Sequence, residues 1–486
     1  MPNILLNFIK FNFQSLILAI FYLALAIGTS IHILLHKDDI KSSIGWIALV
    51  FLSPFIGTIL YIFLGINRVK RKSLKLKRVT NLNESYSHTL INDIFENLPV
   101  NYKQFITFGH KVYTQSFVFG NFIKPLQNGS QAYPEMINAI KEAKKEVLIS
   151  SYIFDYDSET EKFLDAFKIA TSNGAKIKVL IDAIGTLSIF GRSIEKKLKE
   201  IKGLEYGIFL PLKFPLTLPF VNLRNHRKIM IIDGKTAFFG GMNLSKNNCL
   251  INLINDNKNA IIDITFKING PAIQQMAEIF EEDWEFVTEK KFNSIAKSIK
   301  YTNSKGLAAR VIPDGPDKKS NIIELIALGA INAAIKKILI ITPYFLPERN
   351  ILIALEMAAM KGVEVEIILP KIHNSFISKA SEANFLNLIN CGVKIFRTFA
   401  PFDHSKIFVV DSEWVFVGSA NWDVRSFKLN FESNIEIFSK SLAKKLEIIA
   451  KEKKEKATLV TAEYCKNIST LKKLRNNMYR LLTPYG

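Results

Sequence analysis

The sequence is poor in cysteine. Only three of its 486 residues are cysteines, and Cys249, Cys391 and Cys465 show no paired spacing. A framework of disulfide bonds is therefore not expected. The chain also lacks a cluster of cysteine, histidine or carboxylate residues at the spacing of metal ligands, so we expect no metal ion and no other cofactor.

Acidic residues are scarce relative to basic ones. The chain has 44 Asp and Glu against 64 Lys and Arg, a formal net charge of +20. Such a charge attracts either nucleic acid or anionic lipid, and charge alone does not choose between them. Two long apolar segments favour lipid, because a protein that acts on nucleic acid has little reason to be tethered to a membrane.

These apolar segments are residues 13–35 and 44–66. Each has 23 residues without a charged side chain, the length needed to cross about 30 Å of hydrocarbon. We predict two transmembrane helices that form a hairpin. The alternative for the first segment is a cleaved signal peptide, which its length and the closely following second segment disfavour.

Positive charge predicts the orientation of this hairpin. Seven Lys or Arg residues lie between Arg68 and Arg78, whereas the loop between the two spans balances Lys37 and Lys41 against two aspartates. The more basic end is expected to stay in the cytoplasm. We therefore place the remainder of the chain at the cytoplasmic face of the membrane.

Two distant segments share one pattern of histidine, lysine and aspartate. HRKIMIID spans residues 226–233, and HSKIFVVD spans residues 404–411. Side chains two positions apart in a strand point to the same side, so each histidine shares a face with its lysine. A single histidine is more often structural than catalytic, but two in matched positions favour function. The other five histidines lie in no comparable setting.

These residue types suit phosphate chemistry. A neutral imidazole acts as a nucleophile or proton carrier near pH 7, and an ammonium group suits a phosphate oxygen. Behind the motifs, GGMN at 240–243 and GSAN at 418–421 suit tight turns where backbone amides approach an anion. Asp233 and Asp411 close the motifs, where an aspartate suits a structural link or turn as well as catalysis. We keep both readings.

The repeat extends beyond the motifs. KKEVLISSYIF at 144–154 matches KKILIITPYFL at 336–346, and NGAKIKVLID at 173–182 matches KGVEVEIILP at 361–370. Strand, helix, strand and motif strand follow one another in both copies, which predicts two α/β halves. The first half carries a Pro-rich insertion at 207–220, either a packed loop or a lip over the site that touches lipid.

The domain organisation follows from these observations. We predict a membrane hairpin at residues 1–66, a basic linker at 67–110, a first half at 111–300 and a second half at 301–486. The last boundary lies at the polar segment YTNSKG.

The motifs resemble those of the phospholipase D superfamily, in which two HxKx4D segments face each other across a pseudo-twofold axis. The resemblance is closer still to the bacterial cardiolipin synthases of that superfamily. It rests on YIFDYD at 152–157, TPYFLP at 342–347 and above all GSANWDVRSFKLNFESN at 418–434. It implies an α/β fold with two pseudo-twofold-related halves, each a mixed sheet flanked by helices, anchored in the bacterial inner membrane.

The resemblance also implies a metal-free, two-step transfer. One histidine attacks the phosphorus of a phosphatidylglycerol and forms a phosphohistidine, while the other protonates the departing glycerol. A second phosphatidylglycerol then takes the phosphatidyl group, which gives cardiolipin. By analogy, His226 is the nucleophile and His404 the acid and base. Side chains expected to hold the phosphate oxygens, directly or as support, are Lys228, Lys406, Asn243, Ser419 and Asn421.

Each imidazole also needs an acid that fixes its tautomer. The family pattern NFE points to Glu432 in the second half. In the first half the related pattern is Trp-Arg-Asp ahead of Gly-Pro, and this chain has Ile-Ile-Asp ahead of Gly270-Pro271, which makes Asp263 the candidate although its neighbours differ. An acidic residue that relatives often carry soon after Asn243 is absent, and this departure bears on the substrate.

Two other functions fit the same residues. A membrane-bound hydrolase, or a transferase that uses another alcohol such as serine, differs only in what accepts the phosphatidyl group. A catalytically silent lipid-binding or scaffold protein is the third reading, and the two intact motifs argue against it.

Overall fold

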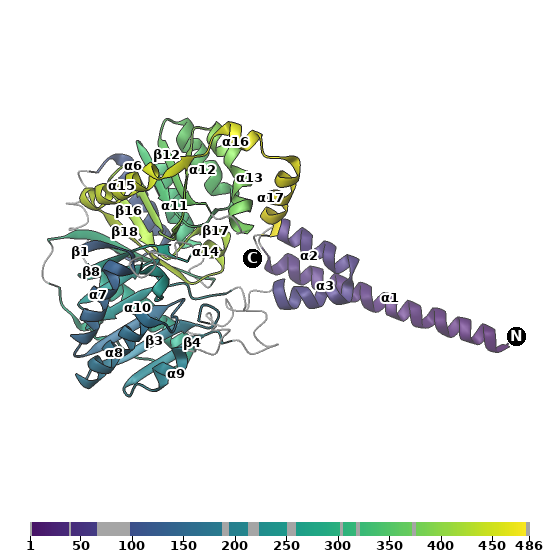
Figure 1. Ribbon diagram of the computed structural model, residues 1–486. Coiled ribbons are helices and arrows are strands. Elements are labelled where there is room, and N and C mark those ends of the chain that lie inside the picture. Colours follow the sequence, from purple (N-terminus) through teal and green to yellow (C-terminus); the bar gives the residue numbers. More distant parts are fainter. Residues whose placement is uncertain are drawn as a thin grey trace. The chain divides into compact units, whose positions relative to one another are not determined.

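The computed structural model describes residues 2–37, 40–65, 98–186, 194–211, 223–249, 259–301, 305–316, 321–371 and 376–482 (Figure 1). The chain divides into two compact units. The N-terminal unit holds the two apolar segments, and the main unit holds both motif-bearing halves.

The N-terminal unit contains one long helix and shorter ones. The helix α1 (Pro2–His36) includes the stretch Ser15–His36, which is long and apolar enough to cross a membrane. The second predicted span is not a single helix, because α2 (Ile40–Leu52) ends before Ser53 and α3 (Pro54–Leu60) begins at a proline, followed by a π-helical turn (Tyr61–Gly65). Proline lacks an N–H group and suits the first turn of a helix rather than its interior.

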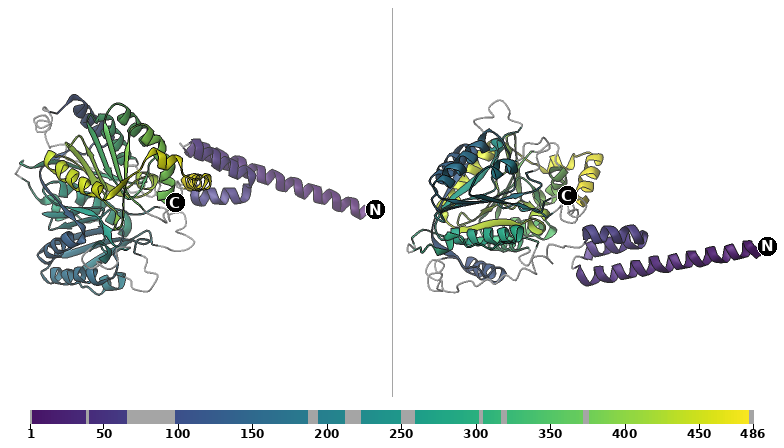
Figure 2. Two further views of the ribbon diagram at one scale, coloured as in Figure 1. Left: turned by 45° about the horizontal axis from the view of Figure 1, so that its top comes forward. Right: turned by 90° about the horizontal axis from the view of Figure 1, so that it is seen from below.

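The chain reverses direction between α2 and α3. A Cβ atom on Gly57 would lie 2.7 Å from a carbonyl oxygen of α2, so the start of α3 lies against the end of α2. The helix α3 then runs in the direction of α1, because Thr58 Oγ1 lies 3.0 Å from Thr29 Oγ1 and the Tyr61 hydroxyl lies 2.9 Å from Nδ1 of His32. Instead of the predicted two-helix hairpin, α1 is accompanied along its C-terminal half by a shorter hairpin, α2–α3 (Figure 2).

One mixed sheet of fifteen strands runs through the described part of the main unit. Outward from the centre, the strand order is β1-β8-β6-β5-β2-β3-β4 in the first half and β9-β18-β16-β15-β10-β12-β13 in the second, with β19 at the outer edge. In both halves the last three of these seven strands are parallel, and the other neighbours are antiparallel. The prediction of an α/β fold with a mixed sheet flanked by helices is confirmed.

The elements of the first half follow the predicted alternation of strands and helices. In chain order they are β1 (Val118–Gln127), α7 (Asn128–Lys141), β2 (Glu146–Ser151), α8 (Ser158–Ser172), β3 (Lys176–Asp182), α9 (Ile194–Lys199), β4 (Leu204–Phe209), β5 (Ile229–Ile232), β6 (Thr236–Gly240), β7 (Ile261–Ile262), β8 (Ile264–Asn269) and α10 (Ala272–Thr288).

The second half repeats this order, with additional short elements within it and further elements at its end. They are β9 (Leu307–Asp314), α11 (Ile322–Ala333), β10 (Lys337–Ile341), β11 (Phe345–Leu346), α12 (Arg349–Met360), β12 (Glu364–Pro370), α13 (Phe376–Asn390), β13 (Lys394–Thr398), β14 (Phe402–Asp403), β15 (Ile407–Val410), β16 (Trp414–Gly418), β17 (Trp422–Asp423), α14 (Val424–Lys428), β18 (Glu432–Phe438), α15 (Lys440–Glu455), β19 (Ala457–Leu459), α16 (Ala462–Lys466) and α17 (Thr470–Leu482).

The two halves share one sheet instead of forming a sheet each. Strands β1 and β9 pair antiparallel at the centre, with Val118 opposite Ala309 and Asn121 opposite Leu307. The fully buried Asn121 side chain donates to the carbonyl of Leu307 at 3.0 Å and accepts from the amide of Ala272 at 2.9 Å. The boundary predicted near residue 301 therefore falls just before β9, at the junction of one continuous sheet.

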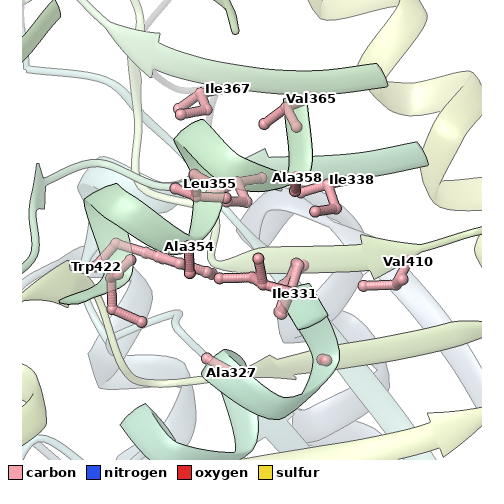
Figure 3. Packing of buried hydrophobic residues seen from close by; sticks show 14 of the residues in the cluster. Ala327, Ile331, Ile338, Ala354, Leu355, Ala358, Val365, Ile367, Val410 and Trp422 are labelled. Carbon is pink, nitrogen blue, oxygen red and sulfur yellow. The ribbon is translucent and has the colours of Figure 1, made fainter. Parts of the chain in front are cut away.

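Helices cover both faces of this sheet (Figure 1). On one face, α10 and α15 share an apolar core with strand residues of both halves. On the other face, α7 and α8 cover the first half, and α11 and α12 cover the second, where Ile331, Leu355 and Trp422 belong to one core (Figure 3). A further helix, α6 (Val100–Val112), adds Tyr102 and Phe105 to that core, so the predicted linker at 67–110 is helical from Val100 onward.

Two predictions lie partly outside the described residues. Of the Pro-rich insertion at 207–220, residues 212–220 are not described, whereas its first residues complete β4. The basic segment between Arg68 and Arg78 also lies outside the described residues.

Candidate active site

The two motif histidines lie beside each other. His226 precedes β5 and His404 precedes β15, which are equivalent strands of the two halves. Their ring centroids are 6.5 Å apart, and their planes are inclined at 81°. Both side chains are largely buried, with 11% and 12% of their surface exposed. A single atom between the two rings is within reach of both.

Each histidine is held by a carboxylate from the other half. Nδ1 of His226 lies 3.0 and 3.1 Å from the two carboxylate oxygens of Glu432, and Nδ1 of His404 lies 2.8 Å from Oδ2 of Asp263. Backbone bonds fix this crossing, because the amide of each histidine donates to the carbonyl just before the acid, at 2.9 and 2.7 Å. The structure thus brings both predicted acids to the histidines and pairs each with the ring of the opposite half.

Glu432 is itself held in place by neighbouring side chains. The hydroxyl of Ser419 donates to its Oε2 at 2.5 Å, and the amide nitrogen of Asn430 donates to its Oε1 at 3.0 Å. Burial alone would raise the pKa of this carboxyl group, but His226, Lys228 and these hydrogen bonds outweigh burial and lower it. Glu432 therefore stays ionised, which favours an Nδ1–H tautomer of His226.

The two imidazoles are neutral near pH 7. Burial lowers the pKa of His226 and of His404 to about 4, and the nearby ammonium groups of Lys228 and Lys406 act in the same direction against the carboxylates. A neutral ring whose Nδ1–H is bonded to a carboxylate carries its lone pair on Nε2. Each histidine thus offers Nε2 as a nucleophile or base, and an anion bound between the rings would raise both pKa values.

Lys228 and Lys406 bring two ammonium groups to the site, and each residue is 5% exposed. Nζ of Lys228 donates to the carbonyl of His226 at 2.6 Å, and Nζ of Lys406 lies 2.9 Å from Nδ1 of His404. Burial lowers the pKa of Lys228 well below its usual value and that of Lys406 to about 8, although the site carboxylates oppose this. An anion between two such cations relieves their repulsion, so the site favours a phosphate group.

The predicted phosphate-binding residues differ in how their side chains are engaged. Oδ1 of Asn243 accepts from the amide of Ile153 at 3.2 Å, which leaves the Nδ2 group for another acceptor. Oδ1 of Asn421 is buried without a hydrogen-bond partner among the described residues. The hydroxyl of Ser419 donates to Glu432, so Ser419 supports the acid and does not direct this hydroxyl toward a phosphate group.

The motif aspartates lie at the opposite ends of β5 and β15 from the histidines. Asp233 accepts from three successive backbone amides at 2.8–2.9 Å, those of residues 144–146, and Asp411 accepts from those of residues 335–337 at 2.7–2.8 Å. Both aspartates have positive φ, 48° and 51°. Of the two readings left open by the sequence, this geometry supports the structural one.

Three other side chains border the site. The ring of Tyr152 lies 5.0 Å from that of His226, and the ring of Phe402 lies 5.9 Å from that of His404. Burial raises the pKa of Asp423 to about 6, and this carboxylate accepts from the amide of Ser426 at 2.7 Å. Of these three, Tyr152 belongs to the internal repeat and Asp423 to the GSANWD segment, so both carry a sequence signal, whereas Phe402 carries none.

The arrangement can transfer a phosphorus-centred group between two oxygens. One Nε2 can form a bond to phosphorus while the other moves a proton on the opposite side, and the ammonium groups stabilise the added negative charge. Among the residues that the structure describes, no group of three or more His, Cys, Asp or Glu side chains could hold a metal ion.

Comparison with known families agrees with this geometry. Residues 136–284 and 327–453 match the family described as "Cardiolipin synthase, PLD-like domain". Residues 24–65 match the family described as "Phospholipase_D-nuclease N-terminal". The chain belongs to the phospholipase D-like cardiolipin synthase family.

Individual relatives cover nearly the whole chain. The cardiolipin synthase of Clostridium perfringens (strain SM101 / Type A) is 32% identical over 93% of this chain and 95% of the relative. The probable cardiolipin synthase YwiE of Bacillus subtilis (strain 168) is 30% identical over 85% of this chain and 82% of the relative. The crystal structure of the phosphatidylserine synthase of Haemophilus influenzae Rd KW20 has the same fold, with a TM-score of 0.60 at 14% identity over 78% of this chain and 99% of that chain.

Proposed function

We propose that this protein is a cardiolipin synthase that transfers a phosphatidyl group from one phosphatidylglycerol to another and releases glycerol. The observation that carries the proposal is the pair of neutral imidazoles 6.5 Å apart, each oriented by a carboxylate from the opposite half. The names of the relatives in Clostridium perfringens and Bacillus subtilis support the choice of reaction.

In the first step, Nε2 of His226 attacks the phosphorus of the bound phosphatidylglycerol. The bond from phosphorus to the headgroup glycerol breaks, and the leaving oxygen takes a proton from His404. The bound phosphate favours this proton on His404 because it raises the pKa of the ring. Glu432 stabilises the positive charge that develops on His226 as the phosphohistidine forms.

In the second step, the roles of the proton carrier reverse. His404 removes a proton from a hydroxyl group of a second phosphatidylglycerol, and that oxygen attacks the phosphorus. The bond between phosphorus and His226 breaks, which returns the nucleophile and gives cardiolipin. The ammonium groups of Lys228 and Lys406, with the amides of Asn243 and Asn421, stabilise the charge of both transition states.

We further propose that α1 anchors the protein in the bacterial inner membrane with the main unit on the cytoplasmic side. The seven basic residues between Arg68 and Arg78 support this orientation. In the described part of the chain α1 is the one helix long and apolar enough to span a bilayer. We therefore propose α1, and not a two-span hairpin, as the transmembrane segment.

The test is to incubate the purified full chain with vesicles of labelled phosphatidylglycerol alone. A synthase forms cardiolipin and glycerol in equal amounts, whereas a hydrolase forms phosphatidic acid and glycerol. Addition of serine distinguishes a transferase that uses another alcohol, because that enzyme would form phosphatidylserine.

The histidine roles are tested in the same assay. Replacement of His226 or His404 by alanine should abolish turnover, while His110→Ala, an exposed histidine of α6, should leave it unchanged. With a phosphatidyl ester of p-nitrophenol, whose leaving group needs no proton from His404, phosphorus label should be trapped on the protein in the His404→Ala variant but not in the His226→Ala variant. Cardiolipin formation that survives either catalytic substitution would contradict the mechanism.

A further inference from the structure

The C-terminal helix α17 presents its apolar side chains to the outside. Leu471, Leu474, Met478 and Leu481 are between 56% and 79% exposed. Their spacing places them on one face of the helix, because residues three or four positions apart lie above one another. A surface helix of a globular protein normally turns such a stripe toward its core.

The opposite face of α17 is polar and makes specific contacts with α13. Asn476 is 2% exposed, and its amide nitrogen donates to Glu382 of α13 at 3.2 Å. The ring of Tyr479 lies 6.4 Å from that of Phe376, also on α13. The orientation of α17 is thus fixed by specific contacts, and the exposed stripe is a consequence of these contacts.

Basic residues lie on the side of α17 that faces the rest of the main unit. An open cavity of about 630 Å³ lies between α17, α13 and β13. Its walls contain two carboxylates, Glu382 and Glu463, and five cations, Lys371, Lys379, Arg397, Lys472 and Arg475. Lys472 and Arg475 each follow a residue of the apolar stripe directly, so positive charge and apolar surface are adjacent on one helix.

Arg397 has hydrogen-bonding capacity that the protein does not use. It is 7% exposed, its NH1 pairs with Glu382 and its NH2 donates to Ser378 at 2.8 Å. Its Nε is buried and has no hydrogen-bond partner among the described residues. With five cations against two carboxylates, the cavity offers more positive charge than its own carboxylates balance.

We propose that α17 and this basic cavity form a second membrane contact, with an anionic bilayer surface. The apolar stripe enters the boundary between headgroups and acyl chains, and the cavity holds the phosphate of an anionic phospholipid. A basic helix with one apolar face is suited to this position, whereas a protein partner gives no reason for the excess of cations beside the stripe. The contact lies outside the histidine site and is independent of the reaction proposed there.

The test places a spin label on each of two faces of α17. The labels are attached at Leu474→Cys, in the stripe, and at Lys473→Cys, an exposed position that is three or four residues from no member of the stripe, with the three native cysteines replaced by alanine. The full chain is reconstituted in nanodiscs of phosphatidylcholine with and without phosphatidylserine. Collisions of each label with oxygen, which enters bilayers, and with a nickel chelate, which stays in water, report the depth of the label.

With phosphatidylserine present, we expect the label at Leu474→Cys to collide severalfold more with oxygen than with the chelate, and the label at Lys473→Cys to remain in water. The change Lys472→Glu with Arg475→Glu should return the first label to water, because each basic residue near an anionic surface contributes about fivefold to binding. Lys444→Glu with Lys451→Glu, on the exposed face of α15, is the control of equal charge and should leave the label in the bilayer.

Three results would overturn the proposal. The label at Leu474→Cys could collide freely with the chelate in both kinds of nanodisc, which places the stripe in water. It could be shielded from both reagents, which places the stripe against protein. The control pair could release the label as fully as the pair on α17, which would make the effect one of net charge alone.

Discussion

The two carboxylates that hold the histidines have different surroundings. Glu432 accepts hydrogen bonds from His226 and from two further side chains of its own half. Asp263 accepts from His404 and, through its other oxygen, from the amide of Ile264 at 2.7 Å. A more fully bonded carboxylate is less easily displaced, which suits Glu432 to His226, the histidine proposed as the nucleophile.

Replacement of either carboxylate by its amide tests these pairs. Glu432→Gln and Asp263→Asn keep the shape of the side chain but remove the charge that stabilises the imidazolium, so we expect turnover to fall by about 10²- to 10⁴-fold. The measurement is cardiolipin formation per folded molecule. Asp233→Asn is the matched control, since among the described residues its carboxylate bonds only to backbone amides, and it should lower stability without lowering this rate.

Lys406 gives the site a defined alkaline limit. With a pKa of about 8 in the free protein, its ammonium group loses its charge as the pH rises through 8. We expect kcat/KM for phosphatidylglycerol to fall roughly tenfold for each further pH unit, because a neutral amine no longer attracts the phosphate. In the Lys406→Arg variant this position stays charged, so the fall that belongs to Lys406 should disappear, and any fall that remains belongs to Lys228, whose pKa burial also lowers. An activity of the unmodified protein that is constant up to pH 9.5 would contradict the assignment.

At the residue scale, local patterns predicted the chemistry but not all the roles. The spacing of the two motifs was enough to identify the histidines and lysines. The resemblance identified Asp263 even though its neighbours depart from the family pattern. The role of Asp233 depends on the amides of residues 144–146, which come to it only because β2 pairs with β5, and no local pattern contains that pairing.

At the scale of single elements, hydropathy predicted where the apolar segments lie but not their path. A run of 23 uncharged residues is long enough to span a bilayer whether it is straight or folded back. Ser53 and Pro54 interrupt the second run, and Thr58 and Tyr61 find polar partners on α1 only when the chain turns back. The proline and the two side-chain contacts with α1 therefore favour the folded-back path of this segment.

The reversal between α2 and α3 predicts a distinct membrane topology. If α1 crosses the bilayer, we expect the residues before α2 and the residues after α3 on the same side of the membrane. The start of α1 is then on the opposite side. Single cysteines at Asn3, Ile40 and Ser73 in sealed vesicles measure this through labelling with an impermeant maleimide. We expect Ile40→Cys and Ser73→Cys to react from the same side and Asn3→Cys from the opposite one. A plain two-span hairpin would instead put Asn3→Cys and Ser73→Cys on the same side.

At the scale of the whole molecule, the two halves depend on each other. Each supplies the acid for the other's histidine, both contribute strands to a single sheet, and one apolar core crosses their junction. The internal repeat predicted two similar halves. It did not predict the shared sheet, because β1 and β9 are far apart in the sequence and neither carries a motif that identifies its partner.

This dependence predicts that the halves unfold together. Asn121 joins β1 to β9, and replacement by alanine leaves buried backbone groups without partners, at about 1–3 kcal/mol for each group. We expect amide hydrogen exchange to accelerate by the same factor, roughly tenfold or more, in β3 of the first half and β12 of the second, both distant from Asn121 in the sheet order. Asn269→Ala is the control, since in the described part of the chain its side-chain amide bonds to Lys235 and Thr236 of the first half alone. Faster exchange in β3 without a matching change in β12 would mean that each half folds by itself, and the crossed carboxylates would then join two independent domains.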